Sequence, residues 1–433
     1  MTTTDRRRQV PPTGEILSDP RVAAATERLG RALVKHVVSE CLSRVRAGQL
    51  PPDDVVDEVL RTLPDVAATV RRVINATGVL VHTNLGRAPL SQAAVAAMAA
   101  AAGAADVEFD LATGRRGRRG RGALTALARA VPQAESVHVV NNNAAALAMV
   151  AATFAVGREI IVSRGELVEI GDGFRIPELL VAAGARLREV GTTNRTSLAD
   201  YRDAIGPDTA LIMKVHPSNF VVRGFTSRVP VAELAALGPP VAVDTGSGLL
   251  RPEPSLPDEP DVATALRDGA DLVMASGDKL LGGPQCGLVF GAVALVERIR
   301  RHPLARAARV DKVTLAALEA SLRGPEPPVR RMLRASVEEV RERAERLARR
   351  LADAGLEAAV QPSEASVGGG AAPDVALPSY AVTVPVDLAE LLRAGRPAVV
   401  GHVDRDRLLL DVRSVDPADD EALAAAVVAA AGR

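Results

Sequence analysis

The 433-residue sequence has few of the features that mark specialised protein classes. Aromatic residues make up 2% of it and tryptophan is absent, so the core must be built from aliphatic side chains. Its two cysteines, Cys41 and Cys286, are far apart, which argues against a disulfide framework and indicates a reducing compartment. The formal net charge is zero, so a nucleic-acid partner would have to be bound by a local basic cluster. No apolar run of about 18 residues and no signal peptide is recognisable, which predicts a cytoplasmic protein without a membrane span.

The pattern of apolar residues changes twice along the chain. Residues 1–72 have the spacing and the helix-start residues of a small helical domain. From Val73 onward, short apolar runs alternate with helical stretches, which predicts a three-layer α/β sandwich with a mostly parallel sheet over residues 73–310. Residues 311–433 contain long amphipathic helices, a stretch rich in Gly, Pro and Ser that reads as a loop or hairpin, and two further apolar runs. They are expected to form a small α/β C-terminal domain.

Lys279 lies between two apolar runs that have the composition of buried strands. The stretch DLVMASGDKLLGGPQCGLVFG covers Asp271–Gly291. A charged amine in a buried position is costly unless it is paired or loses its charge. The segment is therefore either a surface hairpin with an exposed lysine, or a strand end with a desolvated lysine of lowered pKa, suited to Schiff-base and general-base chemistry.

Polar residues also follow three other apolar runs. Asn141, Asn142 and Asn143 follow SVHVV and precede an alanine-rich helix, where they are either capping residues or part of a phosphate-binding cup. Asp244 ends VAVD, and such a carboxylate is either a turn residue or the partner that keeps a pyridine nitrogen protonated. His216 follows ALIMKV, although a lone histidine is more often structural than catalytic. Ligands of open parallel sheets lie beyond the carboxyl ends of the strands, so these side chains are expected near the lysine.

The order of these parts resembles the large pyridoxal phosphate-dependent fold typified by aspartate aminotransferase, the type-I fold. The resemblance implies that Lys279 binds pyridoxal 5′-phosphate as an aldimine and that Asp244, His216 and the asparagines line the cofactor site. Ser276, Gly282 and Gly283 would leave room for the phosphate and the substrate. No metal site is expected, because neither cysteine has the neighbours of one.

Within that fold, the individual strings resemble those of one family. INATGVLVHTNLGRAPLS, GRRGRR, VVNNNAAA, SRGELVEIGDGFRIPEL, EVGTTNRT, KVHPSNF, ASGDKLLGGPQCGLVFG and HPLARAARVDK look like bacterial selenocysteine synthases, the L-seryl-tRNA(Sec) selenium transferases. The resemblance covers almost the whole chain, including the helical N-terminal module that carries tRNA recognition in that family. It implies conversion of seryl-tRNA(Sec) to selenocysteinyl-tRNA(Sec) with selenophosphate, through an aminoacrylyl intermediate on pyridoxal phosphate.

The resemblance also implies roles for residues near the lysine and for several arginines. Lys279 would take the Cα proton of serine, and Asp278 is either the proton donor to the leaving hydroxyl or a solvated turn residue. Arginine binds phosphate-like groups bidentately and stays charged. The selenophosphate site is therefore expected among the arginines of the matching motifs: Arg87, Arg116, Arg119, Arg306 and Arg309. The last two would share one helix face if their segment is helical.

The family resemblance further implies a homo-oligomer, a decamer built as a ring of dimers, and a transient contact with the enzyme that makes selenophosphate. Two other functions fit part of the sequence. A pyridoxal phosphate-dependent lyase acting on a small free substrate, such as a sugar-acid ammonia lyase, shares the SGDK core, but it has no need of the N-terminal helical module. A catalytically dead tRNA-binding protein would not need the intact Lys279, Asp244 and asparagine set.

Overall fold

The structure is a computed structural model, and it describes residues 10–171 and 173–432. The chain divides into two compact units, Met1–Arg72 and Val73–Arg433. Throughout the described residues, no helix combines the length and the apolar character that crossing a membrane requires.

The first unit consists of short helices around a core of its own. Its elements are α1 (Thr13–Ser18), α2 (Pro20–Leu29), α3 (Arg31–Arg46), the 3-10 turn η2 (Pro52–Asp54) and α4 (Val55–Thr62). Asp19 caps α2 by accepting a hydrogen bond from the Arg21 backbone N–H, and Gly30 takes a φ of 88° that allows the chain to turn between α2 and α3. Aliphatic side chains such as Val34, Val38 and Leu42 are buried between the helices.

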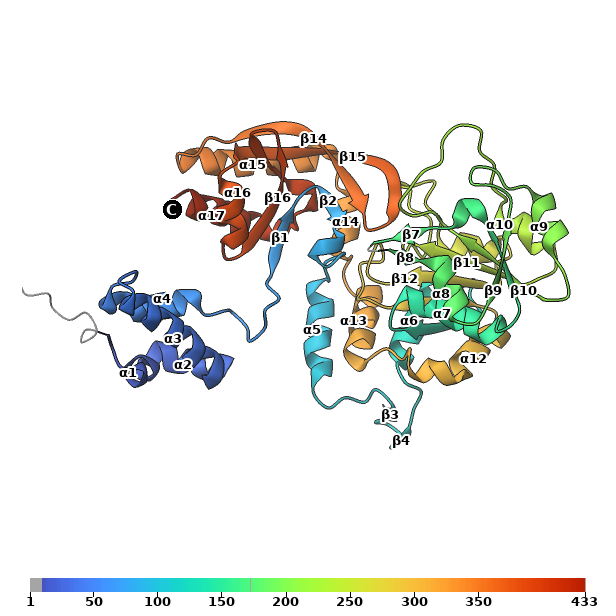
Figure 1. Ribbon diagram of the computed structural model, residues 1–433, viewed down its shortest axis with the longest axis horizontal. Helices are drawn as coiled ribbons and strands as arrows, with labels where there is room; N and C mark the ends of the chain where they lie inside the picture. The colour runs from blue at the N-terminus through green and yellow to red at the C-terminus, as the bar shows by residue number, and fades with distance from the viewer. Residues whose placement is uncertain (1–9, 172, 433) are drawn as a thin grey trace, which may run out of the picture. The chain divides into compact units, whose positions relative to one another are not determined.

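The second unit contains a seven-stranded sheet in the order β5-β13-β12-β11-β10-β6-β9 (Figure 1). In chain order the strands are β5 (Ser136–Val140), β6 (Glu159–Ser163), β9 (Arg186–Val190), β10 (Thr209–Val215), β11 (Val241–Gly246), β12 (Leu272–Ser276) and β13 (Gly287–Gly291). Every pairing from β12 to β9 is parallel, whereas β13 is antiparallel to both of its neighbours. The predicted mostly parallel sheet is therefore confirmed.

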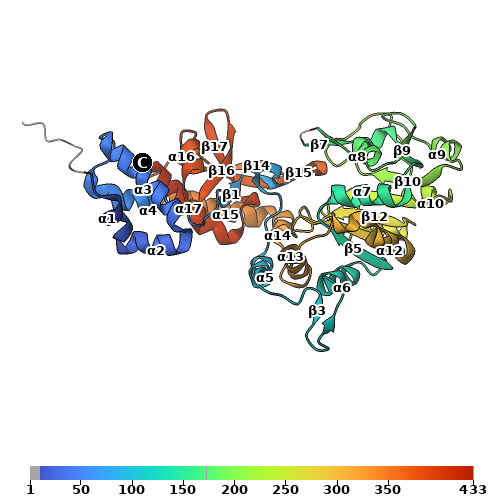
Figure 2. The same cartoon turned by 60° about the horizontal axis from the view of Figure 1, so that its bottom comes forward.

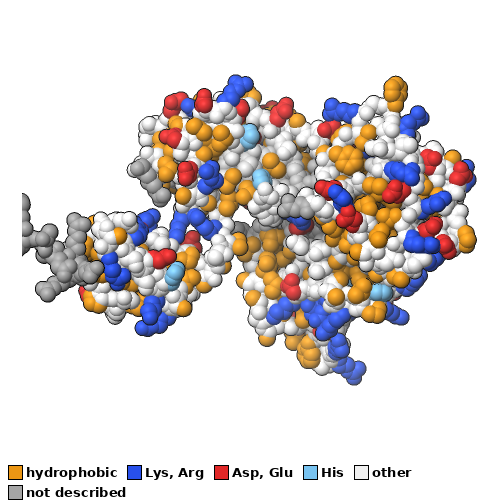
Figure 3. Space-filling view, in the orientation of Figure 1, with side chains coloured by type: hydrophobic (Ala, Val, Ile, Leu, Met, Phe, Trp, Pro, Cys, Tyr) orange, Lys and Arg blue, Asp and Glu red, His pale blue; other side chains and the backbone are white. Residues whose placement is uncertain are grey.

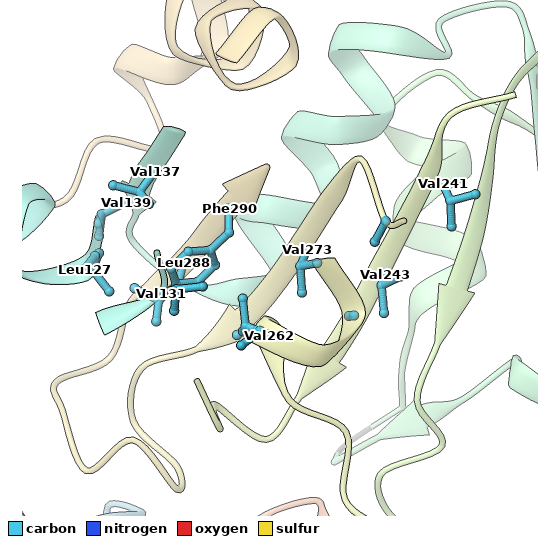
Figure 4. Packing of buried hydrophobic residues seen from close by; sticks show 14 of the residues in the cluster. Leu127, Val131, Val137, Val139, Val241, Val243, Val262, Val273, Leu288 and Phe290 are labelled. Atoms are coloured by element: carbon cyan, nitrogen blue, oxygen red, sulfur yellow. The ribbon is translucent and has the colours of Figure 1, made fainter. Parts of the chain in front are cut away.

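Helices cover both faces of this sheet. One face packs against α7 (Asn143–Phe154), α8 (Ile176–Ala182) and α12 (Val293–Arg301). The other packs against α6 (Arg121–Ala130), α9 (Leu198–Ala204), α10 (Val231–Ala235), α11 (Val262–Arg267) and α13 (Lys312–Arg323). Figure 4 shows valine and leucine side chains of this second core between the strands and α11. Because successive strand residues point to opposite faces, a strand covered on both sides is apolar along its whole length.

A second sheet of six strands has the order β1-β16-β17-β15-β14-β2. Its strands are β1 (Val73–Ala76), β2 (Val79–Val81), β14 (Ala359–Gly368), β15 (Ala371–Pro385), β16 (Ala398–Asp404) and β17 (Arg407–Asp411). The accompanying helices are α14 (Pro328–Arg334), α15 (Val337–Asp353), α16 (Leu388–Ala394) and α17 (Asp420–Ala431). Although the sequence pattern placed residues 73–81 with the catalytic domain, β1 pairs with β16 and β2 with β14. Short apolar runs do not reveal which sheet they join.

Further elements complete the second unit. They are α5 (Gln92–Ala102), the small hairpins β3 (Phe109–Asp110) with β4 (Arg115–Arg116) and β7 (Glu169–Ile170) with β8 (Phe174–Arg175), and the 3-10 turns η3 (Thr83–Leu85), η4 (Arg164–Glu166), η5 (Pro303–Arg306), η6 (Val412–Ser414) and η7 (Pro417–Asp419). The long hairpin β14–β15 turns at Gly368, Gly369 and Gly370, which all have positive φ. Both ribbon views show its tip next to the large sheet (Figures 1 and 2).

Candidate active site

Lys279 lies in the turn after β12 and is buried, with 7% of its surface exposed. Burial lowers the pKa of its amine, while the nearby Asp244 carboxylate acts in the opposite direction and the Arg87 guanidinium lowers it further. The surface-hairpin interpretation of this segment is therefore wrong. The lysine has the desolvated environment that favours a neutral, nucleophilic amine.

Asp244, on β11, is buried and held by two donors. Asn143 Nδ2 donates to Asp244 Oδ1 at 2.9 Å, and the Gly246 backbone N–H donates to the same oxygen at 3.1 Å. Burial raises the pKa of Asp244, and the Asn143 hydrogen bond and the Lys279 charge oppose that shift. A buried carboxylate with these donors is well placed to bind a protonated ring nitrogen.

The three consecutive asparagines have three different environments. Asn142 caps α7 by accepting a hydrogen bond from the Ala145 backbone N–H at 2.8 Å. Asn143 holds the Asp244 carboxylate, whereas Asn141 is exposed and bonds through its backbone N–H to Ala308 O at 3.0 Å. The three side chains therefore do not act together, and the phosphate-binding cup, which depends on free backbone N–H groups at the first turn of α7, stays a prediction. Capping accounts for Asn142, and a side-chain contact that sequence spacing could not reveal accounts for Asn143.

His216 immediately follows β10 and lies beside a buried glutamate that the sequence analysis missed. Its Nε2 is 3.3 Å from Glu259 Oε2, but the two atoms are not aligned as a hydrogen bond, and His216 Nε2 has no hydrogen-bond partner among the residues that the structure describes. The Glu259 side chain is only 1% exposed. A single glutamate in the proline-rich loop SLPDEPD gave no signal of a site.

The glycines predicted to leave room for ligands pack against protein instead. A Cβ on Gly282 would lie 2.4 Å from Pro327 Cβ, and one on Gly283 would lie 3.1 Å from Gly277 O. Gly282 also has a φ of 72°, so the turn itself favours glycine there. Ser276, the last residue of β12, is buried directly before this turn.

Two other glycines border the lysine amine. A Cβ on Gly246 would lie 3.9 Å from Lys279 Nζ, and one on Gly370 would lie 3.7 Å from it. Gly370 belongs to the tip of the β14–β15 hairpin, more than ninety residues along the chain from Lys279. The C-terminal hairpin therefore contributes to this site, which sequence reasoning had not predicted.

Asp278 is buried and forms an ion pair with Arg87. Arg87 Nη1 lies 2.6 Å from Asp278 Oδ2, and the two side chains are 39% and 10% exposed. The Ala88 backbone N–H also donates to Asp278 O at 3.2 Å. The interpretation of Asp278 as a solvated turn residue is wrong, and Arg87 lies next to the lysine loop.

The other four predicted arginines gather elsewhere. Arg116, Arg119, Arg306 and Arg309 line a cavity of about 530 Å³, and Figure 3 shows Lys and Arg side chains around the neighbouring β3–β4 hairpin. Glu108 accepts from Arg116 at 3.1 Å and Arg119 at 3.2 Å, and lies 3.6 Å from Arg309. The hydrogen bonds from Arg119 and from Arg116 hold the pKa of the Glu108 carboxyl below its usual value.

Arg306 and Arg309 do not share a helix. Arg306 ends the short turn η5, and Arg309 lies beyond it in an isolated bridge to Val140. Tertiary folding nevertheless brings both to the same cavity. Lys279, however, does not line that cavity, so the predicted substrate residues fall into two groups within one chain.

The residues around Lys279 fit pyridoxal phosphate. Within the described part of the chain, Asn143 Oδ1, His216 Nε2 and Ser247 Oγ are buried without a hydrogen-bond partner, and such atoms normally have one. They surround a buried amine and a buried carboxylate, which are the groups that the aldehyde and the ring nitrogen of this cofactor require. Among the described residues, no three His, Cys, Asp or Glu side chains lie together in a metal-binding arrangement.

Comparison with known proteins identifies relatives over nearly the full length. Residues 73–416 match the family "L-seryl-tRNA selenium transferase", and residues 7–46 match "Selenocysteine synthase N terminal". The L-seryl-tRNA(Sec) selenium transferase of Moorella thermoacetica is 43% identical over 454 residues, covering 98% of this chain and 96% of that protein. The enzyme of the same name from Solidesulfovibrio magneticus is 45% identical over 460 residues, covering 98% and 97%.

Among solved structures, a D-glucosaminate-6-phosphate ammonia-lyase aligns with a TM-score of 0.58 at 20% identity, covering 84% of this chain and 96% of the lyase. At that identity the likeness shows a shared fold alone. The two sequence comparisons reach further, because they extend over both structural units and include relatives above 40% identity. The chain belongs to the L-seryl-tRNA selenium transferase family.

Proposed function

We propose that this chain converts L-seryl-tRNA(Sec) to L-selenocysteinyl-tRNA(Sec), with selenophosphate as the selenium donor. The observation that supports this most is the buried Lys279 amine beside Asp244, in a chain that is 43–45% identical to L-seryl-tRNA(Sec) selenium transferases. As a member of this family the chain uses pyridoxal 5′-phosphate. The alternative of a small-substrate lyase is not favoured, because the lyase resemblance is limited to the fold.

Each residue near Lys279 has a role in this reaction. When bound, pyridoxal phosphate supplies an electron sink that stabilises negative charge at the serine Cα. Lys279 Nζ would bind the cofactor and then take the Cα proton, and Asp244, held by Asn143, would bind the ring N–H. Asp278 is the candidate proton donor to the leaving hydroxyl. Its carboxylate is paired with Arg87 at 2.6 Å, so it would first have to take up a proton, for which the Cα proton removed by Lys279 is the source. His216, Ser276 and the start of α7 would border the cofactor.

Selenophosphate binding is assigned to the arginine cavity around Glu108. Arg306 and Arg309 would be the principal donors, with Arg116 and Arg119 as helpers, because guanidinium groups bind phosphate-like anions bidentately. Arg87, beside Asp278, would bind selenophosphate when this anion reaches Lys279. A transient contact with the enzyme that supplies selenophosphate would shorten the path of this reactive anion.

The helical unit of residues 1–72 is the proposed tRNA-binding module. Residues 1–72 contain twelve Arg or Lys and ten Asp or Glu, so this unit has a formal net charge of only +2. The sequence of α3 alone has four Arg or Lys against one Glu. Contacts with tRNA phosphates are therefore proposed for α3 rather than for the unit as a whole.

We also propose a homo-oligomer, a decamer built as a ring of dimers, in which the arginine cavity of one subunit faces Lys279 of another. The separation of the two groups within one chain supports this arrangement. Helix α5 supports it as well, because it contains no charged residue and leaves Val95 exposed, and Figure 3 shows apolar side chains over α5. Exposed apolar faces of this kind are typical of subunit contacts.

The decisive experiment incubates the purified protein with seryl-tRNA(Sec) and labelled selenophosphate and identifies the aminoacyl product. Selenocysteinyl-tRNA(Sec) should form with the wild-type chain and not with Lys279→Ala. Mixed oligomers of Lys279→Ala and Arg309→Ala subunits should regain activity if Lys279 and the arginine cavity of one active site come from different subunits. Unchanged seryl-tRNA(Sec) in a cofactor-loaded preparation would contradict the proposed reaction, and inactive mixed oligomers would contradict the shared site.

A further inference from the structure

The tip of the β14–β15 hairpin is attached to the Lys279 site by one buried carboxylate. The Ala372 backbone N–H donates to Glu259 Oε2 at 2.8 Å. Ala372 has a φ of 44°, which is unusual for a residue with a side chain. Two residues earlier, Gly370 borders Lys279 Nζ. The contact with Glu259 therefore lies where the hairpin meets the lysine.

Glu259 has few other means of stabilising a buried charge. Its side chain is 1% exposed, and no residue in the described ranges forms a hydrogen bond with its Oε1. Its close polar neighbours are the Ala372 N–H and the His216 ring, whose Nε2 lies 3.3 Å from Oε2. A buried carboxylate is unfavourable unless it is hydrogen-bonded or paired, so this one favours the arrangement in which both partners are present.

The segment that begins with His216 makes further contacts with the hairpin. A Cβ on Gly370 would lie 3.2 Å from Ser218 Oγ, so the hairpin tip packs closely on this segment. Arg223 Nη2 lies 2.6 Å from Asp374 Oδ2 on β15, although this pair is exposed and so contributes little. The buried Glu259 contact is therefore the stronger attachment.

We propose that Glu259 is a positioning residue that holds His216 and the hairpin tip, Gly368–Ala372, beside Lys279. The carboxylate acts on the reaction through these two neighbours and does not itself touch a reacting atom. By fixing the tip it closes one side of the lysine and excludes water, and its close contact with the His216 ring, 3.3 Å from Oε2, limits where that ring can lie beside the cofactor site. The catalytic consequence rests on the proposed function, whereas the attachment of the hairpin does not.

The test compares three variants of the cofactor-loaded full-length protein. Glu259→Ala removes the acceptor, Glu259→Gln keeps an acceptor oxygen for the Ala372 N–H but loses the charge, and Asp258→Asn changes the exposed neighbouring carboxylate as a control. Amide hydrogen exchange of Gly368–Ala372 should be about ten- to a hundredfold faster in Glu259→Ala, as expected for losing a hydrogen bond to a charged group. It should stay near the wild-type rate in Glu259→Gln and in Asp258→Asn.

A second measurement reports on the orientation of the cofactor. The visible circular dichroism of the bound cofactor should change in both Glu259 variants, because both lose the negative charge beside His216, and kcat should fall with little change in KM for seryl-tRNA(Sec). Wild-type exchange at the hairpin tip in Glu259→Ala would overturn the inference, as would an equal effect of Asp258→Asn. If the exchange rates are as predicted but neither the wild type nor any variant makes selenocysteinyl-tRNA(Sec), the proposed function is wrong. The attachment of the hairpin tip by Glu259 is then still supported.

Discussion

The ion pair between Arg87 and Asp278 gives a prediction whose size follows from its geometry. Arg87→Ala removes a charged hydrogen bond of 2.6 Å to a carboxylate that is 10% exposed. Such a bond contributes about 1.5–3 kcal/mol. The Arg87 side chain is 39% exposed, so solvent screening places its contribution toward the lower end, at about 1.5–2 kcal/mol. That corresponds to a roughly ten- to thirtyfold loss in the rate of the step that Asp278 serves.

Single-turnover conversion of seryl-tRNA(Sec) under saturating selenophosphate measures this step, and the absorbance of the bound cofactor reports whether the site is intact. Arg186→Ala is a matched control, because Arg186 Nη2 also lies 2.6 Å from a carboxylate, Asp208, but both side chains are more than half exposed. The control should retain wild-type turnover. Arg87→Lys should recover only part of the loss, since lysine keeps the charge but not the planar guanidinium.

A double-mutant cycle with Asp278→Asn separates the effect of the Arg87–Asp278 contact from the effects of the two residues taken singly. If Arg87 acts by holding Asp278, adding Arg87→Ala to Asp278→Asn should cause little further loss. Turnover of Arg87→Ala within about twofold of wild type, less than one charged hydrogen bond predicts, would refute this reasoning if the cofactor remains bound. Equal losses in Arg186→Ala would refute it as well.

Three further predictions concern the lysine and the N-terminal unit. Lys279→Met should stabilise the cofactor-free protein, because burial lowers the pKa of the Lys279 amine from 10.5 and so makes its charged form costly in the folded state. The difference in unfolding free energy between this variant and the wild type should narrow as pH rises toward 10.5. Equal stability of the two proteins in denaturant unfolding at all pH values would contradict this prediction. Arg61 and Arg44 lower the pKa of Glu58 to about 2, so the stability that the ionised Glu58 contributes should be lost as pH falls from 4.5 toward 2. Amide exchange in α4 should speed up over that pH range in the wild type, and Glu58→Gln should remove this acid dependence. Deleting residues 1–72 should abolish seryl-tRNA(Sec) binding but not cofactor binding. The affinity of the full chain for seryl-tRNA(Sec) should fall as the salt concentration rises. Unchanged affinity of the truncated chain for seryl-tRNA(Sec) would contradict this prediction.

Much of the catalytic fold could be predicted from local patterns. Apolar runs alternating with helical stretches indicated a mostly parallel sheet between helices, because a strand covered on both faces is apolar throughout. The same reasoning indicated that Lys279, enclosed by two such runs, could be buried. The motif strings around it identified the family, since they preserve the residue types that the chemistry requires.

Only the tertiary structure decided which distant residues meet. Periodicity reports the burial and backbone conformation of a segment, but not its neighbours across the fold. The pairing of Asn143 with Asp244, the approach of Gly370 to Lys279 and the contact of Glu259 with Ala372 therefore left no signal in the sequence. The family motifs likewise indicated one group of arginines, whereas folding placed Arg87 at the lysine and the others around Glu108, because these arginines lie on segments that follow different elements of the fold.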